Sequence, residues 1–155
     1  MAVMMLRAGR WNFIELAFGV GRVAALMDGG FPSDAVAESL EAYSTPLPFT
    51  HQGREELVVI GGDCITGHDA DTGKELWRWG TWNKEKISHW RLVPSVCAGD
   101  GIALACAPKK NPIFAAKLGK SGVLKDSDLA WISEPRDASS DVSTPAFYDG
   151  KFYIL

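Results

Sequence analysis

The sequence has few of the features that define specialised classes of protein. Its 155 residues include only three cysteines and three histidines, and no basic run extends beyond Lys109-Lys110. Sixteen Lys and Arg against nineteen Asp and Glu give a formal net charge of −3, which supplies no electrostatic footprint for nucleic acid. The cysteines have neither zinc-site spacing nor the density of a disulfide scaffold, so Cys64, Cys97 and Cys106 are expected to be small buried hydrophobes.

A hydrophobic run that would cross a membrane is also missing. The most apolar region, Phe13 to Met27, contains Glu15 and Arg22 and is too short to span a bilayer comfortably. Glu15 also interrupts the apolar core that a secretory signal needs, and no small-x-small cleavage site precedes a mature start. We therefore expect no membrane span, and no signal peptide is recognisable in this chain.

Sequence motifs of catalysis are absent. The chain has no Gly-rich phosphate loop, no Gly-x-Ser-x-Gly elbow and no His-Glu-x-x-His pattern, and no two histidines have metal-ligand spacing. Asp141 is a candidate base at a loop, but an aspartate near a strand start is more often a turn cap. His51 and His68 are weaker candidates for a catalytic or binding role. The sequence therefore leans away from an enzyme.

Residues 1–36 differ in composition from the rest and form a separate N-terminal segment. Apolar residues from Trp11 to Met27 recur at roughly helical spacing, which predicts a helix that two internal glycines weaken. A second, short helix is expected from a cap at Ser33 to about Glu41. The segment is either a packing arm, a partner-binding stripe or a poorly ordered leader.

From Tyr43 onward, short β-rich runs alternate with Gly, Asp and Asn turns, which is typical of an all-β meander. Three successive strands are predicted over Glu56–Ile60, Cys64–Asp69 and Glu75–Trp79. The run Ile102–Ala107 is continuously apolar and small, so both of its faces are expected to be buried between neighbouring sheets.

A repeat with a period near 50 organises this β-rich part. A proline, a glycine turn and a strand recur at Pro46, Pro94 and Pro145, which are 48 and 51 residues apart. This period predicts propeller blades, each a four-stranded antiparallel sheet. Within residues 37–155, blade 1 is expected over about 43–82, blade 2 over about 90–133 and a partial blade 3 over about 140–155. About two and a half blades make an incomplete propeller, which predicts a fragment with open edges that can self-associate.

The residues from Gly67 to Trp77 read Gly-His-Asp-Ala-Asp-Thr-Gly-Lys-Glu-Leu-Trp. They resemble the tryptophan-docking motif of the pyrroloquinoline-quinone (PQQ) type propeller repeat. Asp69, Gly73 and Trp77 match the third, seventh and eleventh positions, whereas Gly67 replaces the alanine of the first. We expect Asp69 to accept hydrogen bonds from turn amides, Gly73 to supply the turn's unusual backbone, and Trp77 to stack against the next blade.

Blade 2 carries a degenerate form of the motif. Ala115 takes the first position, Lys117 replaces the aspartate, and a lengthened turn precedes Trp131. The stretch from about Glu38 to Leu155 resembles bacterial PQQ-like β-propeller repeat proteins. These are relatives in fold of quinoprotein alcohol dehydrogenases and of the propeller lipoprotein of the outer-membrane β-barrel assembly machinery.

The resemblance implies a non-catalytic scaffold for binding or protein–protein interaction, within a larger periplasmic or envelope-associated protein. Its partners would be another protein or the remaining blades. The alternative that it implies is a fragment of a PQQ-dependent quinoprotein dehydrogenase, with PQQ and calcium bound in the full-length parent. That family brings a vicinal cysteine pair and a calcium-binding set of acids, and the sequence has no adjacent cysteines and no spaced-acid calcium loop. No cofactor is therefore expected in this chain.

The loop from Thr81 to Arg91 is a candidate binding rim, because such loops connect one blade to the next at one face of a propeller. Its candidate contact residues are Trp82, His89, Trp90 and Arg91, which combine aromatic anchors with a cation. In the alternative, the two tryptophans pack between blades while the histidine and arginine form hydrogen bonds within the fold.

Overall fold

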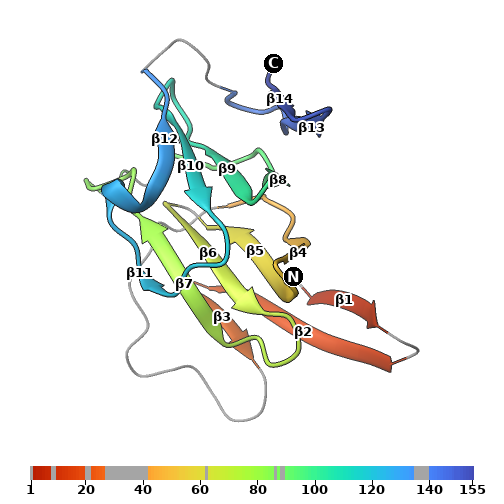
Figure 1. Cartoon of the computed structure of the whole chain (residues 1–155). Helices are drawn as coiled ribbons and strands as arrows, with labels where there is room; N and C mark the ends of the chain where they lie inside the picture. The colour runs from red at the N-terminus through yellow and green to blue at the C-terminus, as the bar shows by residue number, and fades with distance from the viewer. Residues whose placement is uncertain are drawn as a thin grey trace.

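The computed structural model describes residues 2–7, 10–19, 22–26, 42–61, 63–85, 87, 90–134 and 140–155. The regular elements in these ranges are strands and one short 3-10 turn, arranged in four sheets (Figure 1). The all-β class expected from the sequence is therefore confirmed. Among the described residues there is no helix with the length and apolar character that a membrane crossing requires.

The first large sheet is a meander of four antiparallel strands, in which β-branched and aromatic residues are frequent. Its strands in order are β4 (Leu47–His51), β5 (Arg54–Ile60), β6 (Cys64–Asp69) and β7 (Glu75–Gly80). The three strands predicted over residues 56–79 are thus present. A short fifth strand, β11 (Gly122–Val123), pairs in parallel with β7.

The second large sheet repeats this four-stranded antiparallel order. It contains β8 (Cys97–Gly99), β9 (Ile102–Cys106), β10 (Ile113–Lys117) and β12 (Leu129–Ile132). A hairpin of β13 (Ala146–Tyr148) and β14 (Lys151–Tyr153) follows. Figure 1 shows this hairpin beside β8, away from β5–β7. We refer to β4–β7 as repeat 1, to β8–β10 with β12 as repeat 2, and to β13–β14 as repeat 3.

The first hairpin of each repeat uses the same two-residue turn. Gln52-Gly53, Asp100-Gly101 and Asp149-Gly150 all have positive φ, near 50° at the first residue and between 70° and 79° at the glycine. This turn geometry matches the right-handed twist of the strands that it joins. The three glycines are 48 and 49 residues apart, which is close to the period expected from the sequence.

The strand register is also repeated between the two large sheets. Gly67 on β6 lies opposite Trp77 on β7, and Ala115 on β10 lies opposite Trp131 on β12. In both sheets the register shifts directly after this pair, so that one residue of the outer strand bulges. Repeat 2 therefore retains the geometry of the motif although its aspartate and turn length have changed.

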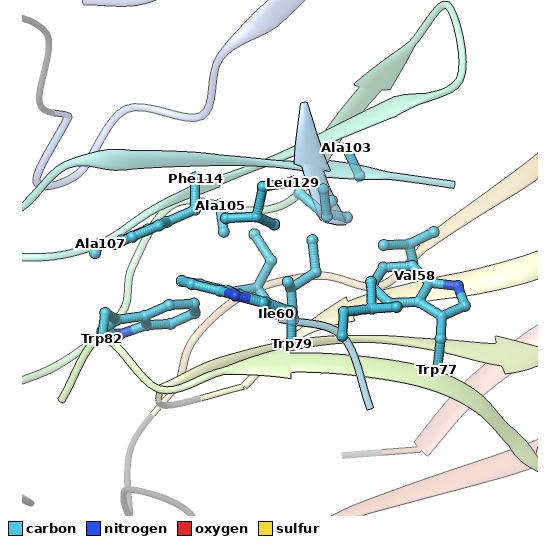
Figure 2. Packing of buried hydrophobic residues seen from close by; sticks show 14 of the residues in the cluster. Val58, Ile60, Trp77, Trp79, Trp82, Ala103, Ala105, Ala107, Phe114 and Leu129 are labelled. Atoms are coloured by element: carbon cyan, nitrogen blue, oxygen red, sulfur yellow. The ribbon is translucent and has the colours of Figure 1, made fainter. Parts of the chain in front are cut away.

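The main core lies between the two large sheets. Figure 2 shows Trp77 and Trp79 of β7, together with Trp82 two residues beyond its end, facing small and aromatic residues of the second sheet. The labelled residues are Val58, Ile60, Trp77, Trp79, Trp82, Ala103, Ala105, Ala107, Phe114 and Leu129. Small alanines on one sheet leave room for the indole rings of the other, which is how large and small side chains fill a core without voids.

Strand β9 is buried on both faces, as its apolar composition predicts. Ala103 and Ala105 belong to the core against repeat 1, whereas Leu104 and Cys106 belong to a second cluster with Ile113. Residues of repeat 3 and its end pack against that second cluster. Repeat 2 is therefore packed between its two neighbours.

The lengthened turn of repeat 2 makes a detour that the sequence did not predict. After β10 the chain leaves its own sheet, forms β11 against repeat 1 and passes through a 3-10 turn, Asp126–Asp128, before β12. The Leu124 amide donates to the Arg78 carbonyl at 2.7 Å, and the Trp79 indole donates to Asp126 Oδ1 at 3.0 Å. These bonds attach repeat 2 to the outer edge of repeat 1.

The helix predicted from Trp11 to Met27 is wrong. The N-terminal segment forms a three-stranded antiparallel sheet of β1 (Ala2–Arg7), β2 (Arg10–Gly19) and β3 (Arg22–Leu26). Glycines are costly inside a helix, and aromatic and β-branched residues favour strands, so the apolar spacing over this run was a misleading signal. The short helix expected from Ser33 to Glu41 lies outside the described residues.

Candidate functional site

The turn between β6 and β7 is held by Asp69, as its spacing predicts. Asp69 Oδ1 accepts hydrogen bonds from the amides of Asp71 at 3.1 Å and Thr72 at 2.7 Å, and from the Thr72 hydroxyl at 2.7 Å. Gly73 has a φ of 72° and donates its N–H to the Asp69 carbonyl at 2.9 Å. The aspartate thereby satisfies the turn amides, and the glycine adopts the left-handed backbone that closes the turn.

Trp77 connects this turn to a buried carboxylate. Its side chain is 0% exposed, and its indole Nε1–H donates to Glu56 Oε2 at 2.6 Å. Glu56 is itself buried and forms an ion pair with Arg54, whose Nε lies 2.7 Å from Oε1. Arg54 Nη2 also donates to the Lys120 carbonyl of repeat 2 at 2.7 Å. A buried charge needs such partners, because an unpaired carboxylate would be strongly unfavourable here.

The sequence pattern predicts Glu56 only as the start of a strand and does not reveal its role as the buried partner of Trp77. Arg54 and Glu56 are two positions apart on β5 and so point to the same face. The same face of the strand carries Val58 and Ile60, which are buried. Two charged residues on an apolar face were the sequence signal that could have indicated a buried ion pair. Their partners, Trp77 and Lys120, are 21 and 66 residues away from them, a separation that only folding brings together.

Gly67 gives the Trp77 indole its room. A Cβ at this position would lie 2.0 Å from Trp77 Nε1 and 2.7 Å from Glu56 Oε2. An alanine, which the resembled motif has at this position, does not fit with the indole placed against Glu56. The departure from the motif and the buried carboxylate are therefore two parts of one arrangement.

Two hydrogen bonds within the same hairpin fix the imidazole ring of His68 in its neutral form. Its Nδ1 lies 3.1 Å from the Gly73 carbonyl, so this nitrogen carries the proton, and Nε2 then accepts from the Thr66 hydroxyl at 2.9 Å. Burial lowers the pKa of His68, which the Gly73 hydrogen bond opposes. Both nitrogens are engaged within the fold, so the side chain stabilises the hairpin.

Trp131 differs from Trp77 in exposure. It lies opposite Ala115 on the face of repeat 2 that is turned toward repeat 3, yet its side chain is 40% exposed. Trp77 is covered by a whole four-stranded sheet, whereas the described part of repeat 3 is a two-stranded hairpin. The indole of Trp131 is therefore only partly covered.

The three prolines of the repeat are buried and lie next to hydrogen bonds that connect successive repeats. The Thr45 amide beside Pro46 donates to Ser95 Oγ at 2.9 Å, and the Ser95 amide beside Pro94 donates to Thr144 Oγ1 at 3.0 Å. The third proline, Pro145, directly follows this acceptor. Amide-to-hydroxyl hydrogen bonds thus connect the segments that lead into the three repeats, although Thr45 precedes its proline and Ser95 follows its proline.

The structure describes three of the four candidate rim residues, and one of these, Trp82, lies in the core. Trp82 is buried and packs near Phe114, with ring centroids 6.0 Å apart and planes 21° apart, which is the placement of the packing alternative. Trp90 is half-buried, Arg91 is exposed, and His89 lies outside the described residues. The loop is instead shaped by Asn83, whose side chain donates to the Ile87 carbonyl at 3.2 Å and accepts from the Ile87 amide at 2.9 Å.

Asp141 and the three cysteines have contacts that stabilise the fold. Asp141 Oδ1 accepts the Lys109 amide at 2.5 Å, so the carboxylate caps a neighbouring loop. The three cysteines are free and buried, as predicted. Burial raises the pKa of Cys97, and burial together with the neighbouring Cys97 raises the pKa of Cys106 to about 12. Such thiols are poor nucleophiles at neutral pH.

The described residues contain no cluster of three or more His, Cys, Asp or Glu side chains that could hold a metal ion. Neither the family models nor the curated proteins compared with this sequence match it. The function is therefore inferred from the arrangement of the repeats.

Proposed function

We propose that this chain is a non-catalytic scaffold of the PQQ-like β-propeller type, which binds a further repeat of the same kind through repeat 3. The observation that supports the proposal is that each junction between successive repeats carries an amide-to-hydroxyl hydrogen bond. These bonds join the segments that lead into the repeats, from Thr45 before β4 to Ser95 before β8, and from Ser95 to Thr144 before β13.

The same face of each repeat is turned toward the next one. With the turn glycines aligned, Glu56 of repeat 1, Leu104 of repeat 2 and Tyr153 of repeat 3 occupy equivalent positions. Glu56 contacts Arg54 and Trp77 beneath repeat 2, and Leu104 is buried in the cluster that repeat 3 covers. Tyr153 is thus the position at which a further repeat would pack.

Repeat 3 exposes aromatic side chains on that face. Tyr153 is 52% exposed and Tyr148 is 74% exposed, whereas Phe147 and Phe152 point the other way and contact each other with ring centroids 4.8 Å apart. A Cβ at Gly99 would lie 2.3 Å from the Phe147 ring, which shows how closely the hairpin packs on repeat 2. Exposed aromatics next to an apolar layer are typical of an interaction surface.

The resemblance implies that this role belongs to a larger envelope-associated protein. There, the docked repeat would belong either to a partner protein or to the remaining blades. In solution, the exposed tyrosine face of repeat 3 in a second molecule provides a surface of the same chemistry, whereas both faces of β5 in repeat 1 are already buried.

Sedimentation velocity over a series of protein concentrations tests the proposal. The chain is expected to self-associate, and Tyr148→Lys with Tyr153→Lys should weaken the association constant by about tenfold or more, the size expected when aromatic anchors are lost. The matched control is Val123→Lys, which places the same charge at another exposed apolar residue, on β11. A folded protein that stays monomeric at every concentration, or an equal effect of the control, would contradict the proposal.

A further inference from the structure

A groove of about 460 Å³ opens where three segments of the two large sheets meet. Its walls come from the β4–β5 turn, the β8–β9 turn and the segment after β10. The volume is within the range of small-molecule sites, roughly 300–1,000 Å³. Nothing in the proposed scaffold role depends on this groove.

His51 lies in the groove between two glycines. A Cβ at Gly101 would be 2.6 Å from His51 Cε1, and a Cβ at Gly119 would be 3.1 Å from His51 Cδ2. Neither glycine has a side chain, so the ring packs directly against the backbone at both positions. Within the described part of the chain, neither ring nitrogen of His51 has a hydrogen-bond partner. The imidazole is thus positioned by packing, and its polar atoms remain available to a ligand.

Two lysines accompany the imidazole. Lys117 and Lys120 line the groove, and neither ammonium group forms an ion pair with the residues that the structure describes. Asp100 is the acidic side chain of the lining, so the local balance is cationic although the chain as a whole has a net charge of −3. Lys117 stands at the position that Asp69 occupies in the motif of repeat 1, so repeat 2 has a cation where repeat 1 has an anion.

The segment that carries the lysines is fixed at both ends. The Leu118 amide donates to the Gly101 carbonyl at 2.8 Å, and Arg54 Nη2 donates to the Lys120 carbonyl at 2.7 Å. Ile102, Leu118 and Ala130 add apolar surface to the lining. A site whose backbone is already ordered loses little entropy when a ligand binds, which favours affinity.

We propose that this groove binds a small organic anion, a carboxylate or a phosphate monoester attached to an apolar body. The acidic group lies among His51, Lys117 and Lys120, and the apolar body lies over Ile102 and Ala130. Charge-assisted hydrogen bonds from ammonium groups are the strong interactions of such a site, and the apolar lining selects against a bare inorganic ion.

Titration of the ¹⁵N-labelled chain by NMR tests this site with three probes of similar size: phenyl phosphate, benzoate and benzyl alcohol. At least one of the two anions should shift the amide signals of Gly101 and Gly119 with a Kd of about 1 mM or tighter, a reasonable affinity for ligands of this size. The stronger of the two anions identifies the acidic group. Benzyl alcohol should bind at least tenfold more weakly.

The double variant Lys117→Met/Lys120→Met should weaken binding of the preferred anion by tenfold or more. Lys84→Met removes an exposed lysine outside the groove and should change the Kd by less than twofold. Amide dispersion reports the fold of each variant, and the two single variants replace the double one if it unfolds, each with an expected loss of about threefold. No saturable shift with either anion, equal binding of benzyl alcohol, or unchanged binding after removal of the lysines would overturn the proposal.

Discussion

Replacement of Gly67 by alanine is the sharpest test of the Trp77 arrangement. The new Cβ would lie 2.0 Å from Trp77 Nε1, 2.3 Å from Cε2 and 2.7 Å from Glu56 Oε2. These separations are far below van der Waals contact, so the indole has to move. Because Gly67 lies directly opposite Trp77 in the register and the indole is fully buried, this movement breaks the Nε1 hydrogen bond to Glu56.

The expected cost combines two effects. Overpacking of a well-filled core costs about 1–3 kcal/mol. Loss of a hydrogen bond to a charged acceptor costs about 1.5–3 kcal/mol. We therefore expect Gly67→Ala to lower the free energy of unfolding by about 2.5–6 kcal/mol, a large part of the roughly 5–15 kcal/mol available to a domain. At about 2–4 °C per kcal/mol for a chain of this size, Tm should fall by about 5–24 °C.

Urea denaturation followed by circular dichroism measures this cost. Gly53→Ala is the matched control, since a Cβ there has open space around it and meets only the penalty of a φ of 79°, about 1 kcal/mol. In a Trp77→Phe background the smaller ring leaves room, so Gly67→Ala should cost less there than in the wild type. A cost no larger than that of Gly53→Ala, or full additivity with Trp77→Phe, would refute the reasoning.

Two further predictions follow from buried titratable groups. Since burial lowers the pKa of His68 in the folded state below its ordinary value of 6.5, the unfolded chain binds more protons below that pH. The contribution of His68 to the free energy of unfolding should therefore be constant above pH 6.5. It should decrease as the pH falls from 6.5 toward the folded-state pKa. Urea midpoints over this range measure it, and a His68→Gln variant that kept the same slope would contradict the assignment. Cys64, Cys97 and Cys106 are buried, so mass spectrometry should find them unmodified by iodoacetamide in the native protein at pH 8 and modified in urea. Burial raises the pKa of Cys106 to about 12. Rapid labelling of this thiol in the native protein would contradict the prediction that it is buried and unreactive.

Features of this chain that depend on neighbours in sequence were predictable. The Asp69 turn involves residues within a few positions of one another, and the two-residue turns at Gly101 and Gly150 follow from glycine's tolerance of positive φ. The burial of both faces of β9 followed from its uninterrupted apolar composition. Cys97 likewise lies opposite Leu104, as the turn at Asp100-Gly101 requires.

The N-terminal segment shows where local pattern alone failed. Apolar residues from Trp11 to Met27 fit a helical spacing, but the chain forms β2 and β3. A short apolar run fits helical and strand periods almost equally well, because both periods can be satisfied by a few residues. The strand β2 pairs with β1, which lies outside this run, and the spacing of apolar residues within the run does not reveal that pairing.

From Tyr43 onward, the sequence by itself determined the strand class, the turns and the near-50-residue spacing, because these depend on residue type and short separations. Tertiary structure alone decided that Glu56 lies beneath Trp77, that the segment around Val123 joins the other sheet, and that His51 fits between Gly101 and Gly119. These contacts connect residues 21 to 68 positions apart. Their energies depend on which atoms become neighbours after the sheets pack, and that information is not contained in any short stretch of the chain.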